Sequence, residues 1–199
     1  MFSQLRPALL ITLALSVLTG ILYPLGITAL SRLLFPAEAN GSLVTRDGTV
    51  VGSKLIAQNF AKPEYFHPRP SAAGTNGYDA TASGGSNLGP TNPDLANRLQ
   101  KDAAAYRADT GSAAPIPADA ITTSGSGLDP EISPANALRQ VNRVAKARHA
   151  DPDRIRLLLE HRVRGRQFGI LGEPRVNVLE LNLALDQHFP VRRQADPAP

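Results

Sequence analysis

The sequence predicts an α+β protein: one N-terminal transmembrane helix, then a single soluble domain of short strands and about four helices. Three observations support this fold class. A long uncharged apolar segment lies near the N-terminus, a hairpin pattern follows it, and helix-start signals recur in the second half of the chain. The 199 residues are 42% apolar and 19% charged, which is typical of neither a disordered chain nor a polytopic membrane protein.

The apolar segment, residues 7–31, lies between Arg6 and Arg32 and contains no charged residue. A helix of about 25 residues is about 37 Å long and spans a hydrocarbon core of about 30 Å with some tilt. The competing interpretation is a cleaved signal peptide, because residues 37–39 (Ala-Glu-Ala) have the small-x-small pattern of a cleavage site. Since a signal peptide has an apolar region of only about 7–15 residues, we interpret 7–31 as a retained anchor.

The basic residues around this anchor predict its orientation. Residues 1–6 carry one arginine and the α-amino group, whereas Arg32 on the other side is soon followed by Glu38. This pattern favours a cytoplasmic N-terminal tail and an external domain, which in a bacterium is periplasmic. We therefore expect a single-pass inner-membrane protein with a soluble domain over 37–190 and a flexible tail over 191–199.

Small residues recur at every fourth position along the expected anchor. They are Ala8, Thr12, Ser16, Gly20 and Pro24. Such a stripe lets a second helix approach closely, although these residue types are also common in membrane helices in general. The stripe predicts a helix-packing partner within the membrane, and its proline predicts a kink.

The soluble domain has local signals for strands and for helices. Asp47-Gly48 between two short apolar runs predicts a hairpin. The expected strands cover residues 43–45, 49–51, 55–60 and 121–123. Three helices are expected to begin where a capping side chain precedes a proline, and a fourth follows from an apolar run. The expected helices cover residues 92–109, 133–149, 151–164 and 177–188.

Residues 62–93 form a long irregular segment rich in Pro, Gly, Ser and Asn, and its aromatic residues predict an ordered loop that packs or binds. Its glycine-rich part could offer backbone amides to an anion, while a tight turn is the simpler interpretation. The candidate contact residues there are Ser83, Gly84, Gly85, Ser86 and Asn87.

Several classes of chemistry have no sequence signal. The chain contains no cysteine, which excludes disulfides, thiolate metal sites and cysteine nucleophiles. Its four histidines are scattered, and no nucleophile elbow or Walker loop occurs. The formal net charge of +4 is small, and with a membrane anchor it argues against nucleic-acid binding.

Basic residues are concentrated late in the chain. Residues 139–175 contain ten basic and four acidic residues. This excess could form a docking surface on the expected helix 133–149, with Gln140, Arg143 and Lys146 as candidate partner contacts, or it could be an ordinary solvated helix face.

Several longer motifs cover most of the chain in order. They are YFHPRPSA at 65–72, SGGSNL at 83–88, SGSGLDP at 124–130, RVAKAR at 143–148 and VNVLELNLALD at 176–186. Together with the expected anchor, they resemble the KdpC subunits of bacterial Kdp potassium-transporting P-type ATPases. One departure is Ala57, where that family is expected to have glycine.

The resemblance implies a non-catalytic accessory subunit. Its expected partners are a potassium-conducting subunit and a P-type ATPase subunit, and it is expected to assist assembly and to act as a catalytic chaperone that raises ATP affinity. No cofactor is expected to bind firmly, but ATP would bind in a transient complex, through residues 83–87 or the helix around Arg143.

The periplasm contains no ATP, so an external domain would instead brace the potassium-conducting subunit and act on the ATPase through coupled conformations. The alternative function is a free-standing, membrane-tethered periplasmic enzyme or ligand-binding protein with His67, Arg69 and Asp79 clustered in the long loop.

Overall fold

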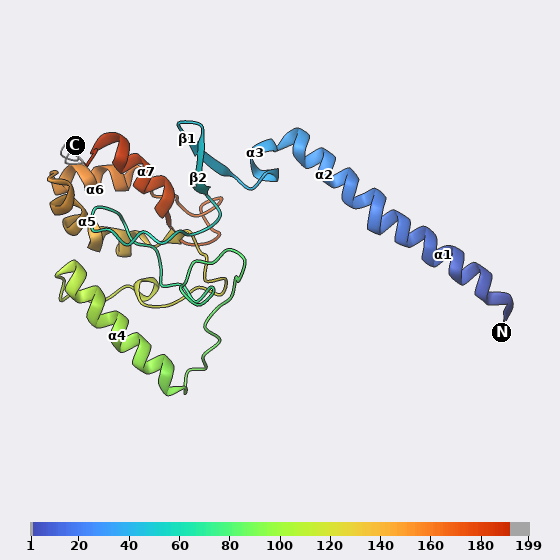
Figure 1. The fold of residues 1–199 in the computed structure, drawn as a ribbon, viewed down its shortest axis with the longest axis horizontal. Coiled ribbons are helices and arrows are strands. Elements are labelled where there is room, and N and C mark those ends of the chain that lie inside the picture. The colour runs from blue at the N-terminus through green and yellow to red at the C-terminus, as the bar shows by residue number, and fades with distance from the viewer. Residues whose placement is uncertain (1, 192–199) are drawn as a thin grey trace, which may run out of the picture. The chain divides into compact units, whose positions relative to one another are not determined.

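The structure is a computed structural model that describes residues 2–191, and these form two compact units that meet between Val51 and Gly52 (Figure 1). The first unit contains an apolar helix, a short helix after it and most of a hairpin, and the second contains the helices and strands that follow. Except for its first residue, the tail expected over 191–199 lies outside the described residues.

The apolar segment forms one helix over Leu5–Leu34, long and apolar enough to cross a membrane. It consists of α1 (Leu5–Val17), a π-helical turn (Leu18–Leu22) and α2 (Tyr23–Leu34), and the short helix α3 (Pro36–Ala39) follows. Almost every side chain along it is exposed. The helix therefore extends a few residues beyond both ends of the predicted segment.

The π-helical turn is how this helix accommodates Pro24. Proline has no amide hydrogen for the carbonyl of Gly20, and its ring crowds that oxygen. Just before it, the Tyr23 amide donates to the carbonyl of Leu18, five residues earlier, which widens the turn. A kink at Pro24 stays a prediction, and the structure shows a π-helical turn just N-terminal to this proline within one continuous helix.

The hairpin consists of β1 (Leu43–Arg46) and β2 (Thr49–Ser53). Its turn residues Asp47 and Gly48 have φ values of 51° and 77°, as a two-residue primed turn requires. The hairpin predicted from Asp47-Gly48 is confirmed. The boundary between the two units lies within β2.

Four helices form the body of the second unit: α4 (Pro93–Thr110), α5 (Pro134–Arg148), α6 (Pro152–Glu160) and α7 (Val178–His188). Each begins after a side chain that accepts a hydrogen bond from a first-turn amide. These capping residues are Asn92, Ser133, Asp151 and Asn177. The predicted helix starts are confirmed, because capping depends only on neighbouring residues.

The strands of the second unit differ from the prediction. Two-residue strands β3 (Glu131–Ile132) and β4 (Val176–Asn177) pair antiparallel, with Ile132 opposite Val176. The strand predicted over 55–60 was wrong, since that segment is irregular and the Ala57 amide bonds to the carbonyl of Leu128. The strand predicted over 121–123 was also wrong, because it continues a 3-10 turn at Ala118–Ala120.

The core lies between α5, α6 and α7, which Figure 1 shows side by side. Its fully buried side chains include Val141, Ile155, Leu159 and Leu185 from these helices. Ile132 and Val176 of the short strands are buried with them, and so is Phe66, which comes from the long irregular segment and is 0% exposed. The segment is therefore part of the fold, and it brings its neighbouring residues against α5.

Candidate functional site

Phe66 is fixed in the core by its backbone as well as by its ring. Its amide donates to Oδ1 of Asn182 at 2.8 Å, and its carbonyl accepts from Nδ2 of the same side chain at 2.9 Å. Asn182 is itself buried on α7 and so finds both partners that a buried amide needs. The Asn182 side chain therefore supplies the acceptor and the donor that a neighbouring strand would supply to an extended backbone.

Gln140 of α5 binds the next residue of the segment in the same way. Its Oε1 accepts from the amide of His67 at 2.7 Å, and its Nε2 donates to the carbonyl of His67 at 3.2 Å. Nε2 also donates to Oδ1 of Asn136, which in turn accepts from the hydroxyl of Tyr106 on α4. Gln140 is 2% exposed, so this predicted contact residue lies inside the unit.

Arg143, one helical turn later, binds the same segment. Its Nη1 donates to the carbonyls of Pro63 at 2.6 Å and Tyr65 at 2.9 Å, and its Nη2 donates to Gln140. Its Nε lies 2.9 Å from Oδ2 of Asp109 on α4. Burial lowers the pKa of the Arg143 guanidinium, and Asp109 opposes that shift. Arg143 therefore joins α4, α5 and the long segment.

Arg148, the last residue of α5, extends this set of side-chain contacts to the C-terminal end of the helix. Its side chain is fully buried and donates to the carbonyls of Glu64 and Phe189 and to a carboxylate oxygen of Asp186 at 3.0 Å. Its guanidinium also lies over the ring of Tyr65, 5.0 Å from the ring centre. In contrast, Lys146 on the same helix is exposed.

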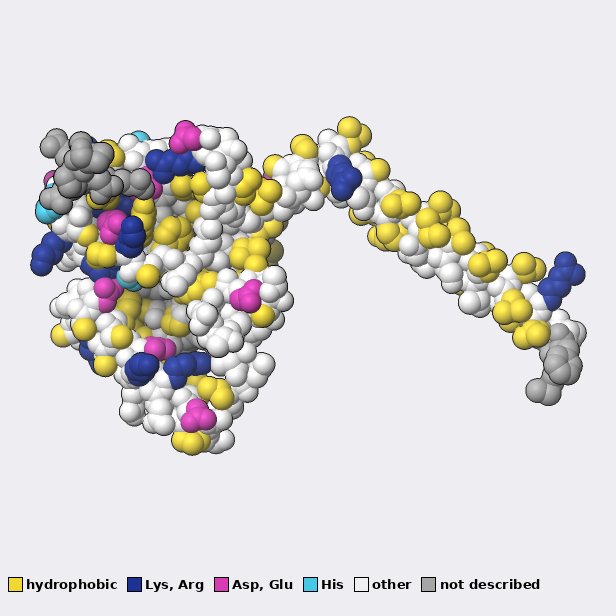
Figure 2. Space-filling model, viewed as in Figure 1, with side chains coloured by type: hydrophobic (Ala, Val, Ile, Leu, Met, Phe, Trp, Pro, Cys, Tyr) yellow, Lys and Arg dark blue, Asp and Glu magenta, His cyan; other side chains and the backbone are white. Residues whose placement is uncertain are grey.

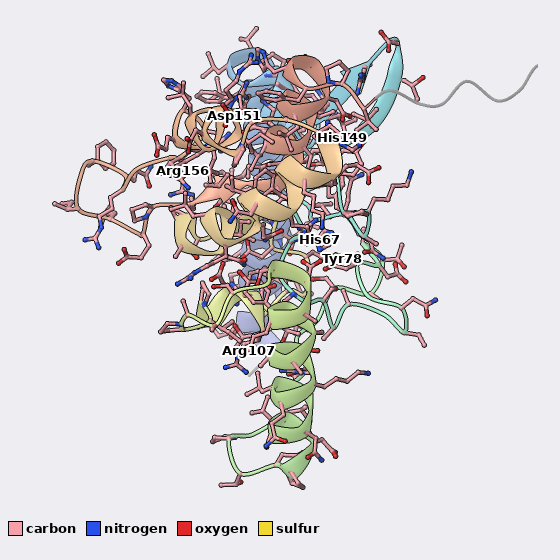
Figure 3. All side chains as sticks on the ribbon, turned by 90° about the vertical axis from the view of Figure 1, so that its left-hand side faces the viewer. His67, Tyr78, Arg107, His149, Asp151 and Arg156 are labelled. Atoms are coloured by element: carbon pink, nitrogen blue, oxygen red, sulfur yellow. The ribbon has the colours of Figure 1, made fainter. Side chains whose placement is uncertain are left out.

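A cavity of about 360 Å³ lies beside this network, between the long segment, α4 and α5. Figure 3 shows His67 and Tyr78 near the end of α4. Burial raises the pKa of Tyr78 and that of Tyr106 to about 12, and burial together with Arg143 lowers the pKa of His67. The cavity therefore presents two protonated phenols and a neutral imidazole at neutral pH.

The carboxylates of Asp102 and Asp109 also line the cavity, together with the side-chain amides of Asn59, Asn136 and Gln140. No motif of the amino-acid sequence singled out the two aspartates, or Tyr106 and Asn136. Spacing of three or four residues along α4 would have placed Asp102, Tyr106 and Asp109 on one helix face. The spacing does not show which other segment of the chain covers that helix face.

The glycine-rich segment 83–87 packs against the turn at 124–127. The amide of Gly84 and the hydroxyl of Ser83 both donate to the carbonyl of Ser126, at 2.8 and 3.0 Å. A Cβ on Gly127, which has a φ of 68°, would lie 2.6 Å from the carbonyl oxygen of Gly84. Two of the five predicted contact residues thus make structural hydrogen bonds, and Ser86 and Asn87 lie next to them.

Ser71 connects this junction to the rest of the long segment. Its hydroxyl donates to the carbonyl of Gly127 at 2.6 Å and accepts from the amides of Ala73 and Tyr78. The Tyr78 hydroxyl donates to the carbonyl of Arg69 at 2.7 Å. The motif residues at 65–72, 83–88 and 124–130 therefore form one continuous contact region.

The three residues considered for a loop-borne ligand site have separate partners. Arg69 pairs with Asp129 at 3.0 Å, and His67 lies 3.8 Å from Asp109. Asp79 is exposed and accepts from Thr81, which lowers its pKa. Among residues 2–191, no group of three His, Cys, Asp or Glu side chains is placed to hold a metal ion.

The predicted membrane stripe lies along the apolar helix of the first unit. Ala8, Thr12, Ser16, Gly20 and Pro24 are all exposed, and no side chain lies within 4 Å of a Cβ built on Gly20. Figure 2 shows apolar side chains along this helix, with basic side chains near its two ends. The stripe is therefore accessible to a second helix.

Comparison with known proteins covers both units. Residues 5–187 match the family model described as KdpC, the c chain of the K⁺-transporting ATPase. The chain is 59% identical over 186 residues to a protein of Gemmatimonas aurantiaca named potassium-transporting ATPase KdpC subunit, covering 94% of each chain. Proteins of the same name from Rhodospirillum rubrum and a Caulobacter species are 56% and 55% identical, over 96% and 98% of this chain and 99% and 98% of theirs.

Proposed function

This chain belongs to the KdpC family of K⁺-transporting ATPase subunits, and from this premise we propose that it is a non-catalytic accessory subunit of an ATP-driven potassium uptake complex. It is a single-pass protein of the bacterial inner membrane with its second unit in the periplasm. It assists assembly with the potassium-conducting and ATPase subunits and raises the ATP affinity of the latter. The observation that carries this proposal is the family match, which includes both the apolar helix and the second unit.

The apolar helix is the proposed site of assembly within the membrane. Its side chains are exposed over Leu5–Leu30, and its small-residue stripe allows close backbone approach. Gly20→Leu should lower the yield of complex purified in mild detergent by about threefold or more, since a large side chain holds the partner helix away. Ala14→Leu is the matched control, because residue 14 lies on the opposite side from residues 12 and 16. Equal yields for both variants would contradict helix packing through the stripe.

Two routes could raise the ATP affinity of the ATPase subunit. In the first, the second unit braces the potassium-conducting subunit and acts through coupled conformations. In the second, residues 83–87 or the helix around Arg143 contact the nucleotide. The contacts of the second unit favour bracing, because Ser83 and Gly84 bond to Ser126 and Arg143 bonds to backbone carbonyls within the unit.

The location of the second unit decides between these routes. The chain has no cysteine, so a single Gln100→Cys on the exposed face of α4 reports its location without a background signal. Labelling of intact cells by a membrane-impermeant maleimide is expected, and it would exclude direct contact with cytoplasmic ATP. Labelling only after lysis would reverse the orientation and leave nucleotide contact as the route. Binding of labelled ATP to the purified chain at cellular concentration tests that contact directly.

A further inference from the structure

The loop between α6 and β4, residues 161–175, carries a group of exposed apolar side chains at its tip. Phe168 is 84% exposed, Ile170 75% and Leu171 54%. We call residues 167–171 the apolar knob. Figure 3 shows the loop that bears it projecting from the rest of the second unit. Adjacent large apolar side chains on a protruding loop are an unusual surface for a soluble unit and indicate an interaction site.

The knob has a defined backbone shape. Gln167 and Leu171 bond to each other through both amides and both carbonyls, at 2.8 and 2.9 Å. Between them Phe168 and Gly169 have φ values of 55° and 77°, which closes a tight turn. A positive φ at a phenylalanine is strained. The closed turn directs the Phe168 side chain outward at a conformational cost. Because the backbone of the turn is already ordered, the knob loses little conformational entropy when it binds a partner.

Below the knob the loop continues as a short two-stranded stalk. Arg164 and Arg175 exchange backbone hydrogen bonds at 2.8 and 3.0 Å. Between that pair and the knob, Arg166 donates to both carboxylate oxygens of Glu173, at 2.8 and 2.7 Å. The knob is therefore presented on a stalk held by backbone pairing and by an ion pair in which Nη2 of Arg166 donates to both oxygens of Glu173.

The charges of the stalk are compensated within the unit. Arg175 Nε lies 2.7 Å from Glu131, and Arg164 pairs with Glu180 of α7. The knob itself contains no charged residue. Binding of a loop to anionic lipid depends on free basic residues beside its apolar side chains. Here Arg164, Arg166 and Arg175 have carboxylate partners, and the remaining arginine of the loop, Arg162, precedes the Arg164–Arg175 pair and so lies at the base of the stalk, away from the knob. An uncharged, preshaped tip is instead complementary to an uncharged pocket of a protein.

We propose that the apolar knob is a docking element, and that Phe168 and Ile170 insert into an apolar pocket on a larger subunit of the same transporter. This inference rests on the proposed function, because it names the surface through which the second unit contacts its partner. An exposed aromatic side chain on a hydrogen-bonded turn is the kind of anchor that dominates binding energy at protein interfaces. The anchor in the membrane and the knob would then hold the subunit at two points, which raises the effective concentration of each contact.

A photo-crosslink at the knob tests the proposal directly. Gln167→Cys, which keeps Phe168 and Ile170 in place, is labelled with a benzophenone maleimide in membranes that contain the whole complex and should give an adduct with a larger subunit after illumination. Gln100→Cys on α4 is the control and should give much less of that adduct. An adduct with lipid only, an adduct with a second copy of this chain, or a yield equal to that of the control would each overturn the proposal.

Loss of the apolar side chains gives an independent measurement. Phe168→Ser combined with Ile170→Ser should release the chain from the purified complex about tenfold faster on dilution, with unchanged unfolding of the chain itself. Leu157→Ser on α6, also an exposed apolar residue, is the matched control and should dissociate at the wild-type rate. If the wild-type chain fails to co-purify with larger subunits, the proposed function fails together with this inference. If it co-purifies and the double variant dissociates at the wild-type rate, only the knob proposal fails.

Discussion

Arg143 and Lys146 lie one turn apart on α5 and have the same charge, yet the structure gives them different roles. Only 7% of the Arg143 side chain is exposed, and it binds Pro63, Tyr65, Gln140 and Asp109. Lys146 is exposed. Arg143→Ala should therefore destabilise the second unit, and Lys146→Ala should not.

The expected loss follows from the bonds of the guanidinium. A hydrogen bond to a charged group contributes about 1.5–3 kcal/mol to stability. The contributions of the three hydrogen bonds that Arg143 donates do not simply add, because one side chain makes them all. Asp109 is about one-third exposed and regains water when its partner is removed. We therefore expect Arg143→Ala to lower the free energy of unfolding by about 3 kcal/mol. Lys146→Ala should change it by less than about 0.5 kcal/mol, as for other surface substitutions.

Urea unfolding of the full chain in mild detergent measures this difference, followed by near-ultraviolet circular dichroism of the tyrosines. With an m-value of about 2 kcal/mol per molar urea, the Arg143→Ala midpoint should fall by about 1.5 M. A fall below about 0.5 M would refute the assignment of Arg143 to the fold. The partner contact predicted for Gln140, Arg143 and Lys146 stays a prediction, and reduced complex yield for Lys146→Ala with normal stability would support it at that residue.

Three further outcomes can be measured in the same unfolding assay. Gly127→Ala should destabilise the unit by about 2–4 kcal/mol, because its Cβ would clash with Gly84 at a positive φ, whereas Gly125→Ala should be nearly neutral. The pKa of His67 is lowered in the folded state, so as the pH falls the unfolded chain is protonated at His67 before the folded chain is. The free energy of unfolding should therefore fall as the pH drops below about 6.5, the ordinary pKa of histidine, and this fall should be smaller in His67→Asn. Tyr78→Phe removes one part-buried hydrogen bond and should cost about 1 kcal/mol, and no measurable cost would count against that bond.

Helix positions could be predicted from the sequence because their signals are local. Asn92, Ser133 and Asp151 each precede a proline, and each caps the helix that the sequence predicts there. The end of α6 shows the limit of such signals. The helix stops at Glu160 rather than near Arg164, because Arg164 pairs with Arg175 in the stalk. That pairing joins residues eleven apart through a turn whose apolar tip gives no local strand pattern.

The strands of the second unit could not be predicted for a similar reason. β3 and β4 are two residues long, too short for an alternating pattern, and they come from distant parts of the chain. The segment 55–60 has strand-like composition but stays irregular, and its Ala57 amide donates to the carbonyl of Leu128. Tertiary context decides strand formation at such positions.

The candidate site was only partly predictable. Gln140 and Arg143 could be placed on the polar side of α5 by helical spacing, but no local pattern indicated that residues 62–70 would cover that side. The structure buries them because the backbone of an irregular segment needs donors and acceptors, which these two side chains supply. A polar residue on a helix face therefore says little about exposure until the neighbouring segment is known.

Potassium-stimulated ATP hydrolysis, measured against ATP concentration in membranes with and without this chain, tests the central claim most directly. The partner subunits are expressed in both samples, and their amounts are compared. Omission of the chain should abolish the activity or raise the KM for ATP, although the hydrolytic residues of the ATPase subunit remain in place. Equal activity and equal KM in both samples would contradict the assignment of this chain as an accessory subunit of the transporter.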